Sequence, residues 1–188
     1  KYDRSEPDFG ELPLFKSPSV WKGKLENGMT VTGIENNEVP LVEFDITIPG
    51  GQLIESIEKA GVSSLLSDLL MQGTKTKSAA DLEEAIGMLG ASINMYTTNE
   101  DFHVTGSCLA KNFEETIALV KEIILEPRWD EKEYNRLKQA LETNLKGREA
   151  NPNFIASSNF NKLIYGENHP FGVPTSGNFE SVSKITLN

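Results

Sequence analysis

Three polar side chains within one mostly apolar stretch are the first candidates for chemistry. Ser64, Ser67 and Asp68 are spaced i, i+3 and i+4, so a helix would place them side by side on one face. Hydroxyls beside a carboxylate suggest nucleophilic catalysis, but a nucleophile needs a general base within hydrogen-bond reach. Neither of the two histidines, His103 and His169, is close to this stretch in the sequence. A polar helix face held by hydrogen bonds is therefore the favoured interpretation.

The other residues that commonly carry chemistry are few. Cys108 is the single cysteine, so the chain has no intrachain disulfide and no cysteine-based zinc cage. It alternates with apolar residues in a predicted strand, which favours a buried and inert thiol. Gly50-Gly51 follows Pro49 and lacks a downstream Gly-Lys-Ser/Thr pattern, so it indicates a turn and not a phosphate-binding loop.

The composition excludes several classes of partner. The chain has 188 residues, with 18 basic and 28 acidic side chains and a net charge of −10. This charge disfavours nucleic acids and anionic membranes, which attract basic surfaces. No apolar run approaches the ~20 residues that span a bilayer, so no membrane insertion is predicted.

Periodicity and turn signals predict the elements that must position these residues. The stretch 61–71 carries apolar residues at spacings of three and four, which predicts a helix with one buried face. Strands are predicted at 21–25, 29–35, 41–48, 92–97 and 102–109, and helices at 61–71, 79–89, 113–125, 130–148 and 153–165. Hairpins join the strands and the helices come in runs. This order predicts an α+β fold, with an antiparallel or mixed sheet packed against a layer of helices.

The two ends of the chain differ from its middle. Residues 1–20 hold three prolines among polar residues and are predicted to form an extended arm or linker. Residues 21–188 are predicted to form one domain. The chain starts with Lys1 and stops in what looks like the approach to another helix, which suggests a fragment cut at its C-terminus. The sequence therefore does not set a compartment.

The order of these pieces resembles that of the M16 metallopeptidases, the pitrilysin or inverzincin family, and of the mitochondrial processing peptidases. The residues that carry the resemblance are LENGM at 25–29, Pro40, the strand 41–48, Gly50-Gly51, Glu55, Gly61, Gly73-Thr74, GASIN at 90–94, Thr97-Thr98, PRW at 127–129 and HPFG at 169–172. The resemblance covers residues 20–188. It implies a half-domain of the M16 fold, truncated at its C-terminus.

Active members carry H-x-x-E-H on the helix that corresponds to 61–71. The two histidines bind zinc and the glutamate acts as general base, while a glutamate on a later helix completes the coordination. The resemblance places Ser64 and Asp68 at the histidine positions and Ser67 at the general-base position. The distal glutamate position falls at about Asn144, with Glu142 nearby. Serine is a poor zinc ligand, so no metal and no catalytic residue are predicted in this chain.

The resemblance also implies a partner. M16 proteins consist of two similar halves that close around a peptide, and typically one half keeps the metal site. The chain is therefore predicted to be the non-catalytic half, which forms the opposing wall of a peptide chamber. Zinc and H-x-x-E-H are expected in a catalytic half, supplied in cis or in trans. A bacterial chain of this kind would fit a periplasmic or cell-envelope location.

One strand is a candidate for peptide contact. In catalytic halves the strand that matches 92–97 is an edge that pairs with extended substrate. Asn94, Tyr96 and Thr98 alternate along it and are the predicted contacts, although an interior strand remains the alternative. Two other functions stay open. One is a structural or assembly subunit with no peptidase role, and the other is an independent peptide-binding module.

Overall fold

The computed structural model describes residue 10 and residues 17–187, so most of the predicted arm lies outside the described residues. The chain divides into two units, Lys1–Val39 and Pro40–Asn188. In the first unit, β1 (Val20–Lys24) pairs antiparallel with β2 (Thr30–Ile34). The Gly28 amide donates to the Leu25 carbonyl at 2.9 Å, and Gly28 has a φ of 88°. This is the hairpin that Asn27-Gly28 predicts.

The second unit is built on a three-stranded sheet. β3 (Leu41–Pro49), β5 (Asp101–Leu109) and β4 (Ser92–Thr97) lie in the order β3-β5-β4, and both pairings are antiparallel. The sheet predicted as antiparallel or mixed is therefore antiparallel in the described part of the chain. Phe44 of β3 lies opposite Gly106 of β5, where a Cβ would come within 2.5 Å of the Phe44 ring. Glycine at 106 lets this ring lie against the strand.

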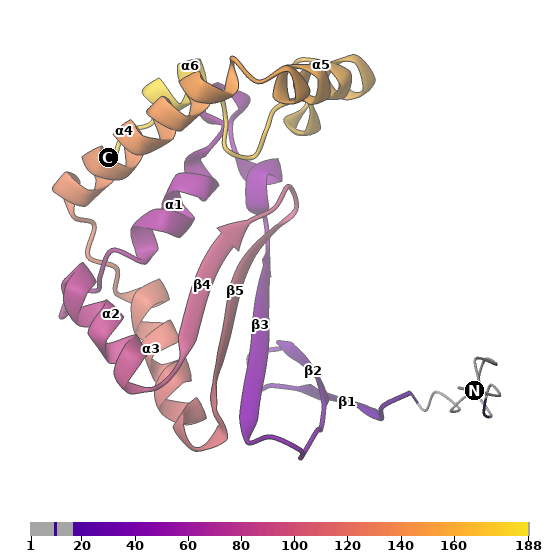
Figure 1. The fold of residues 1–188 in the computed structure, drawn as a ribbon, viewed down its shortest axis with the longest axis vertical. Coiled ribbons are helices and arrows are strands. Elements are labelled where there is room, and N and C mark those ends of the chain that lie inside the picture. The colour runs from indigo at the N-terminus through magenta and orange to yellow at the C-terminus, as the bar shows by residue number, and fades with distance from the viewer. Residues whose placement is uncertain (1–9, 11–16, 188) are drawn as a thin grey trace, which may run out of the picture. The chain divides into compact units, whose positions relative to one another are not determined.

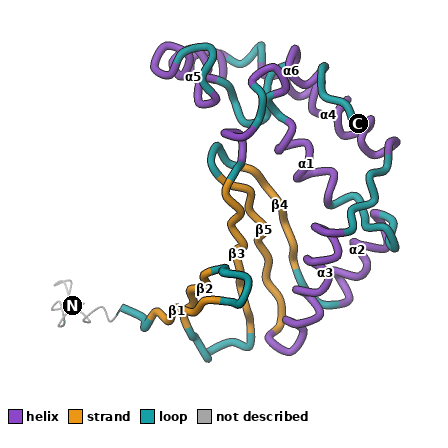
Figure 2. Tube along the Cα trace, turned by 180° about the vertical axis from the view of Figure 1, so that it is seen from behind, coloured by secondary structure: helices purple, strands orange, loops and turns teal. Residues whose placement is uncertain are grey.

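Six helices complete the second unit in the described part of the chain. They are α1 (Val62–Leu70), α2 (Ala79–Met88), α3 (Phe113–Leu125), α4 (Glu131–Arg148), α5 (Pro152–Tyr165) and α6 (Phe179–Ser183). Short 3-10 turns at Gly51–Ile54, Ile57–Lys59, Ala110–Asn112 and Pro170–Gly172 connect them. Figures 1 and 2 show α1, α2 and α3 together on one face of the sheet, with α4 and α6 beyond α1. Five of these helices match predicted ones, and α6 is the addition.

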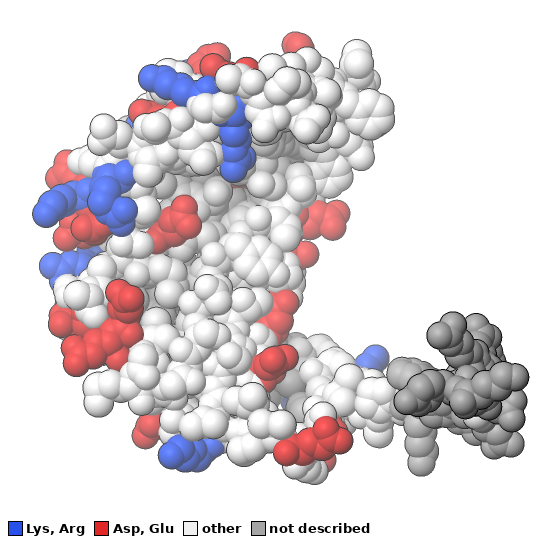
Figure 3. All heavy atoms as spheres, viewed as in Figure 1, with Lys and Arg blue, Asp and Glu red and all other residues white. Residues whose placement is uncertain are grey.

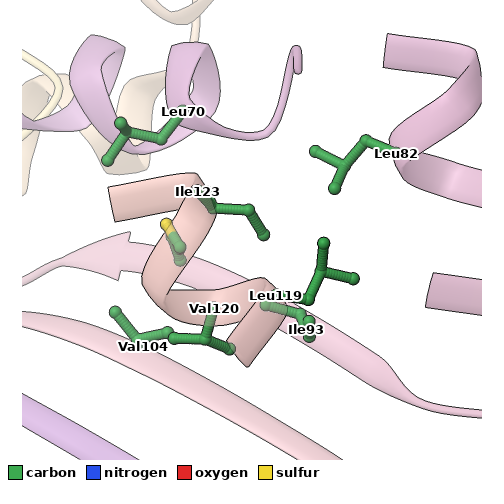
Figure 4. Close-up of a cluster of buried hydrophobic side chains, with 8 residues drawn as sticks. Leu70, Leu82, Ile93, Val104, Leu119, Val120 and Ile123 are labelled. Carbon is green, nitrogen blue, oxygen red and sulfur yellow. The ribbon is translucent and has the colours of Figure 1, made fainter. Parts of the chain in front are cut away.

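Two apolar clusters hold these layers together. The first lies between the sheet and α1, α2 and α3, and includes Leu82, Val104 and Ile123, each at most 1% exposed (Figure 4). The second joins α1 to α4 and α6 through Leu65, Leu69, Tyr134, Leu145, Val182 and Ile185. Helix α1 contributes to both clusters, because its apolar stripe is wide enough to face the sheet and α4. No described helix is long and apolar enough to cross a membrane.

Candidate functional site

The N-terminus of helix α1 is fixed by hydrogen bonds to Glu55 and by close packing around Gly61. The Glu55 carboxylate accepts hydrogen bonds from the Gly61 amide at 2.8 Å and the Ser63 amide at 2.6 Å, and the Ser63 hydroxyl also donates to it. A carboxylate here satisfies amides that have no partner within the helix. Gly61 has a φ of 105°, and a Cβ at this residue would lie 2.9 Å from the Ser176 carbonyl oxygen. These contacts fix where the polar face of α1 lies.

Ser67 is the buried member of the predicted polar cluster, with 3% of its surface exposed. Its hydroxyl lies 2.8 Å from the Ser63 carbonyl oxygen and 2.9 Å from the Thr97 hydroxyl. The Thr97 hydroxyl lies 3.0 Å from the same carbonyl. Two hydroxyl protons serve three contacts, so only two of the three hydrogen bonds form at once. The result is a neutral network that joins α1 to the end of β4.

The other two positions on α1 differ from Ser67. Ser64 is half-buried, and Asp68 is exposed. Partial desolvation raises the pKa of the Asp68 carboxyl above its ordinary value, so the surroundings disfavour its charge.

The fourth position lies on α4, which packs against α1 through the second apolar cluster. Asn144 is exposed there and lines an open groove with Arg136, Gln139, Ala140 and Thr143. Glu142, the neighbouring alternative, is half-buried, and its charge helps to raise the pKa of Tyr134 after the larger effect of burial. The structure thus separates the four positions into one buried hydroxyl, one half-buried hydroxyl, one exposed amide and one carboxyl.

This donor set does not fit zinc. Tetrahedral zinc sites use thiolates, imidazoles and carboxylates, and hydroxyls and amides are poor substitutes. Within the described ranges, no group of three or more His, Cys, Asp and Glu side chains is placed to hold a metal ion. The Ser67 hydroxyl is moreover occupied by its network with Ser63 and Thr97. We therefore derive no metal-dependent step from these residues.

The predicted peptide contacts on β4 divide into two groups. β4 lies at an edge of the sheet formed by the described strands, with Asn94 and Tyr96 exposed. The Tyr96 ring stacks on the His103 ring at 4.8 Å, and His103 Nδ1 lies 3.0 Å from the Asp45 carboxylate. Thr98, by contrast, lies past the end of β4. Its hydroxyl accepts from the Asp101 amide at 3.0 Å, so it closes the β4–β5 turn.

A second polar cluster, which sequence reasoning did not identify, lies just after α1. Glu122 of α3 accepts hydrogen bonds from the Thr74 hydroxyl at 2.6 Å, the Thr76 hydroxyl at 2.6 Å and the Lys77 ammonium at 2.7 Å. The Lys77 contact, followed by the two hydroxyls, lowers the pKa of Glu122 to about 2. Gly73-Thr74 was the only sequence signal for this cluster, because Glu122 lies 45 residues from Lys77. Both carboxylate oxygens accept hydrogen bonds from these side chains, so the carboxylate has a structural role and is not available for catalysis.

Comparison with known proteins gives a consistent assignment. The family model described as insulinase, peptidase family M16, matches residues 31–171 of the 188-residue chain. An uncharacterised zinc protease of Bacillus subtilis is 26% identical over 160 residues, and a non-peptidase homologue of Helicobacter pylori is 24% identical over 153 residues. These matches cover 85% and 81% of this chain, but only 39% and 35% of the relatives. The chain thus spans less than half the length of the curated relatives it matches.

A solved structure supports the same fold. The peptidase M16 inactive domain from Pseudomonas fluorescens superposes with a TM-score of 0.83 at 22% identity, over 89% of this chain and 41% of that one. At this identity the likeness establishes the fold alone, as an M16 half-domain. The family match itself extends over well more than half of the sequence. The chain therefore belongs to peptidase family M16, the insulinase family.

Proposed function

We propose that this chain is part of the non-catalytic half of an M16 peptidase and forms one wall of a peptide-binding chamber. Peptide cleavage would then be the task of a partner half that carries H-x-x-E-H and zinc, in the same polypeptide or in a second one. The observation that carries the proposal is the Ser63–Ser67–Thr97 network. At Ser67, the position that the resemblance assigns to the general base, this network holds a buried, neutral hydroxyl.

The printed names of the relatives support this proposal. A structural neighbour is described as an inactive domain, and a Helicobacter pylori relative as a non-peptidase homologue. Other relatives are described as zinc proteases, so the family contains both kinds of protein. The residues of this chain fit the inactive proteins, because α1 carries neither the two histidines that would bind zinc nor the glutamate between them.

The edge of β4 is the part of the wall that we assign to peptide contact. An exposed sheet edge offers unpaired backbone N–H and C=O groups to an extended chain. The exposed side chains of Asn94 and Tyr96 stand beside this edge. The peptide chamber requires no metal on this wall, since the opposing half supplies it.

Metal analysis and a peptidase assay on the 188-residue chain test the proposal. We expect no stoichiometric zinc after incubation with zinc chloride and dialysis, and no cleavage of an internally quenched extended peptide above the buffer rate. The Ser67→Ala variant is the matched control, and it should behave identically in both assays. Stoichiometric zinc, or cleavage that a chelator abolishes, would contradict a non-catalytic role.

A further inference from the structure

A polar cavity of about 620 Å³ lies at the end of β4. Its lining includes the β4–β5 turn at residues 98–100, Arg148 at the C-terminal end of α4, and the aromatic side chains of Tyr165 and Phe171. Figure 3 shows basic atoms reaching from the end of α4 over a hollow above the sheet. Because Thr98 directly follows the last residue of β4, the strand leads into this cavity.

The wall of the cavity is tied together by a buried side chain. Gln52 is 2% exposed, and its amide nitrogen donates to the carbonyl oxygens of Val173 and Pro174, both at 3.0 Å. Its amide oxygen accepts from Asn99 at 2.9 Å. The turn after β4 and the segment at 173–174 are therefore held in one arrangement, which gives the cavity a preformed shape.

The Arg148 side chain is held in place by its neighbours, but no ion pair among the described residues balances its positive charge. One of its guanidinium nitrogens lies 3.3 Å from the Ser176 hydroxyl, and the guanidinium lies 5.7 Å from the centre of the Phe154 ring. The ion pairs found among the described residues do not include Arg148. A guanidinium has five N–H donors in a planar fork, so most of them remain for a ligand. A carboxylate matches this fork with two parallel hydrogen bonds.

The charged residues that line the cavity indicate which kind of anion it can bind. Glu100 is the one acidic residue in the lining, so the ionisable lining residues sum to zero net charge. A doubly charged anion such as phosphate is disfavoured by Glu100. A single carboxylate attached to a peptide group fits better, because the Asn99 and Asn161 amides in the lining can serve the peptide group.

We propose that this cavity receives the C-terminal carboxylate of an extended peptide that lies along β4. The proposal rests on the proposed function, in which the β4 edge contacts peptide. Arg148 binds the carboxylate, and the last side chain packs against Tyr165 and Phe171, whose rings meet edge to face at 5.4 Å. Because β4 runs toward the cavity, the bound peptide runs parallel to β4.

Titration of the isotopically labelled 188-residue chain with two synthetic peptides tests this assignment. Both are N-acetylated Val-Thr-Val-Thr-Phe, one with a free C-terminal carboxylate and one with a carboxamide. We expect the acid to bind about fivefold more tightly, near the upper limit for a partly exposed ion pair. Backbone shifts should map to residues 92–100. A version of the acid peptide that carries a spin label in place of the N-terminal acetyl group should broaden signals at the Ser92 end of β4.

Two variants show whether the preference for the acid depends on Arg148 itself or on the positive charge at this end of α4. Arg148→Gln should abolish the preference for the acid and leave carboxamide binding unchanged. Lys146→Gln is the matched control, because it removes one positive charge from the same end of α4. Its ammonium lies over the Phe179 ring at 4.3 Å and does not line the cavity. This variant should keep the preference, and inorganic phosphate should not displace the peptide acid.

Equal binding of acid and carboxamide along β4 would overturn the carboxylate assignment and leave the proposed function standing. Displacement by phosphate at the peptide's own concentration would also overturn it, since it would indicate a simple anion site. If neither peptide binds β4, both the inference and the peptide contact in the proposed function fail.

Discussion

The two polar clusters at the ends of α1 have opposite characters. Ser63, Ser67 and Thr97 form a neutral network between α1 and β4, while Glu122 lies in a charged cluster with Thr74 and Lys77. Strongly perturbed pKa values often mark active sites. Here the group with the largest shift, Glu122, is fully used by structural donors, whereas the Ser63–Ser67–Thr97 network contains no ionisable group. The comparison teaches that a strongly shifted pKa in this domain marks a structural hydrogen-bond cluster and not a site of chemistry.

The largest effect should come from placing a carboxylate in the neutral network. Ser67 is 3% exposed, and its partners are a hydroxyl and a carbonyl oxygen. Ser67→Glu buries a carboxylate there, so we expect the free energy of unfolding to fall by about 2–4 kcal/mol. Urea unfolding followed by circular dichroism measures this change. Asp68→Glu at the adjacent exposed position is the control and should stay within about 0.5 kcal/mol of the parent. Equal stability of both variants would show that the network tolerates charge.

Removing the charge from the second cluster should have the next largest effect. Glu122→Gln weakens the hydrogen bonds that three donor groups make to an ionised carboxylate. We expect a loss of about 1.5–3 kcal/mol in the free energy of unfolding at pH 7. Glu84→Gln, on the exposed surface of α2, makes the same chemical change without these partners. The same denaturation experiment on the control should show almost no loss.

The contribution of Glu122 should also depend on pH in a known direction. Its folded-state pKa of about 2 lies below the ordinary value of 4.5, so its stabilisation is fully present above about 4.5. It is lost as the pH falls toward 2. The stability difference between the parent and Glu122→Gln should therefore shrink between pH 5 and pH 2.5. A difference that stays constant over this range would contradict the charge-based explanation.

The smallest effect should follow from opening the neutral network. Thr97→Val removes one hydroxyl and one of its hydrogen bonds, and we expect a loss of about 1 kcal/mol that does not vary with pH. Thr47→Val on the exposed side of β3 is the matched control, since valine suits a strand equally well. If the stability lost in Thr97→Val varied with pH, the network would not be neutral, and the contrast between the two clusters would fail.

Much of the fold follows from local sequence signals. The apolar stripe of α1 and the Asn27-Gly28 turn each predict an element that the structure contains. These signals are local because a helix face or a tight turn is set by residues a few positions apart. Helix α6 was missed since it has only five residues, too few for a clear periodicity.

The site was less predictable because its contacts join distant segments. The spacing places Ser67 on a polar helix face, but its partner Thr97 lies 30 residues away, and no local pattern links the two. The sequence pattern predicts Thr98 as a peptide contact in line with Asn94 and Tyr96, whereas in the structure its hydroxyl closes the β4–β5 turn. Gln52 and Arg148 carry no local signal at all. Their roles arise from segments that meet only in the folded chain.

The two hydrogen bonds of Gln52 to Val173 and Pro174 join residues 121 and 122 positions apart. The bond from Ser181 to the Ala60 carbonyl also spans 121 positions. Closing such long loops is entropically costly, and contacts of this range slow folding. We therefore expect the segment at 173–185 to dock after the sheet and the first three helices have formed. In that sequence of events, the cavity beside Arg148 is the last feature of the domain to appear.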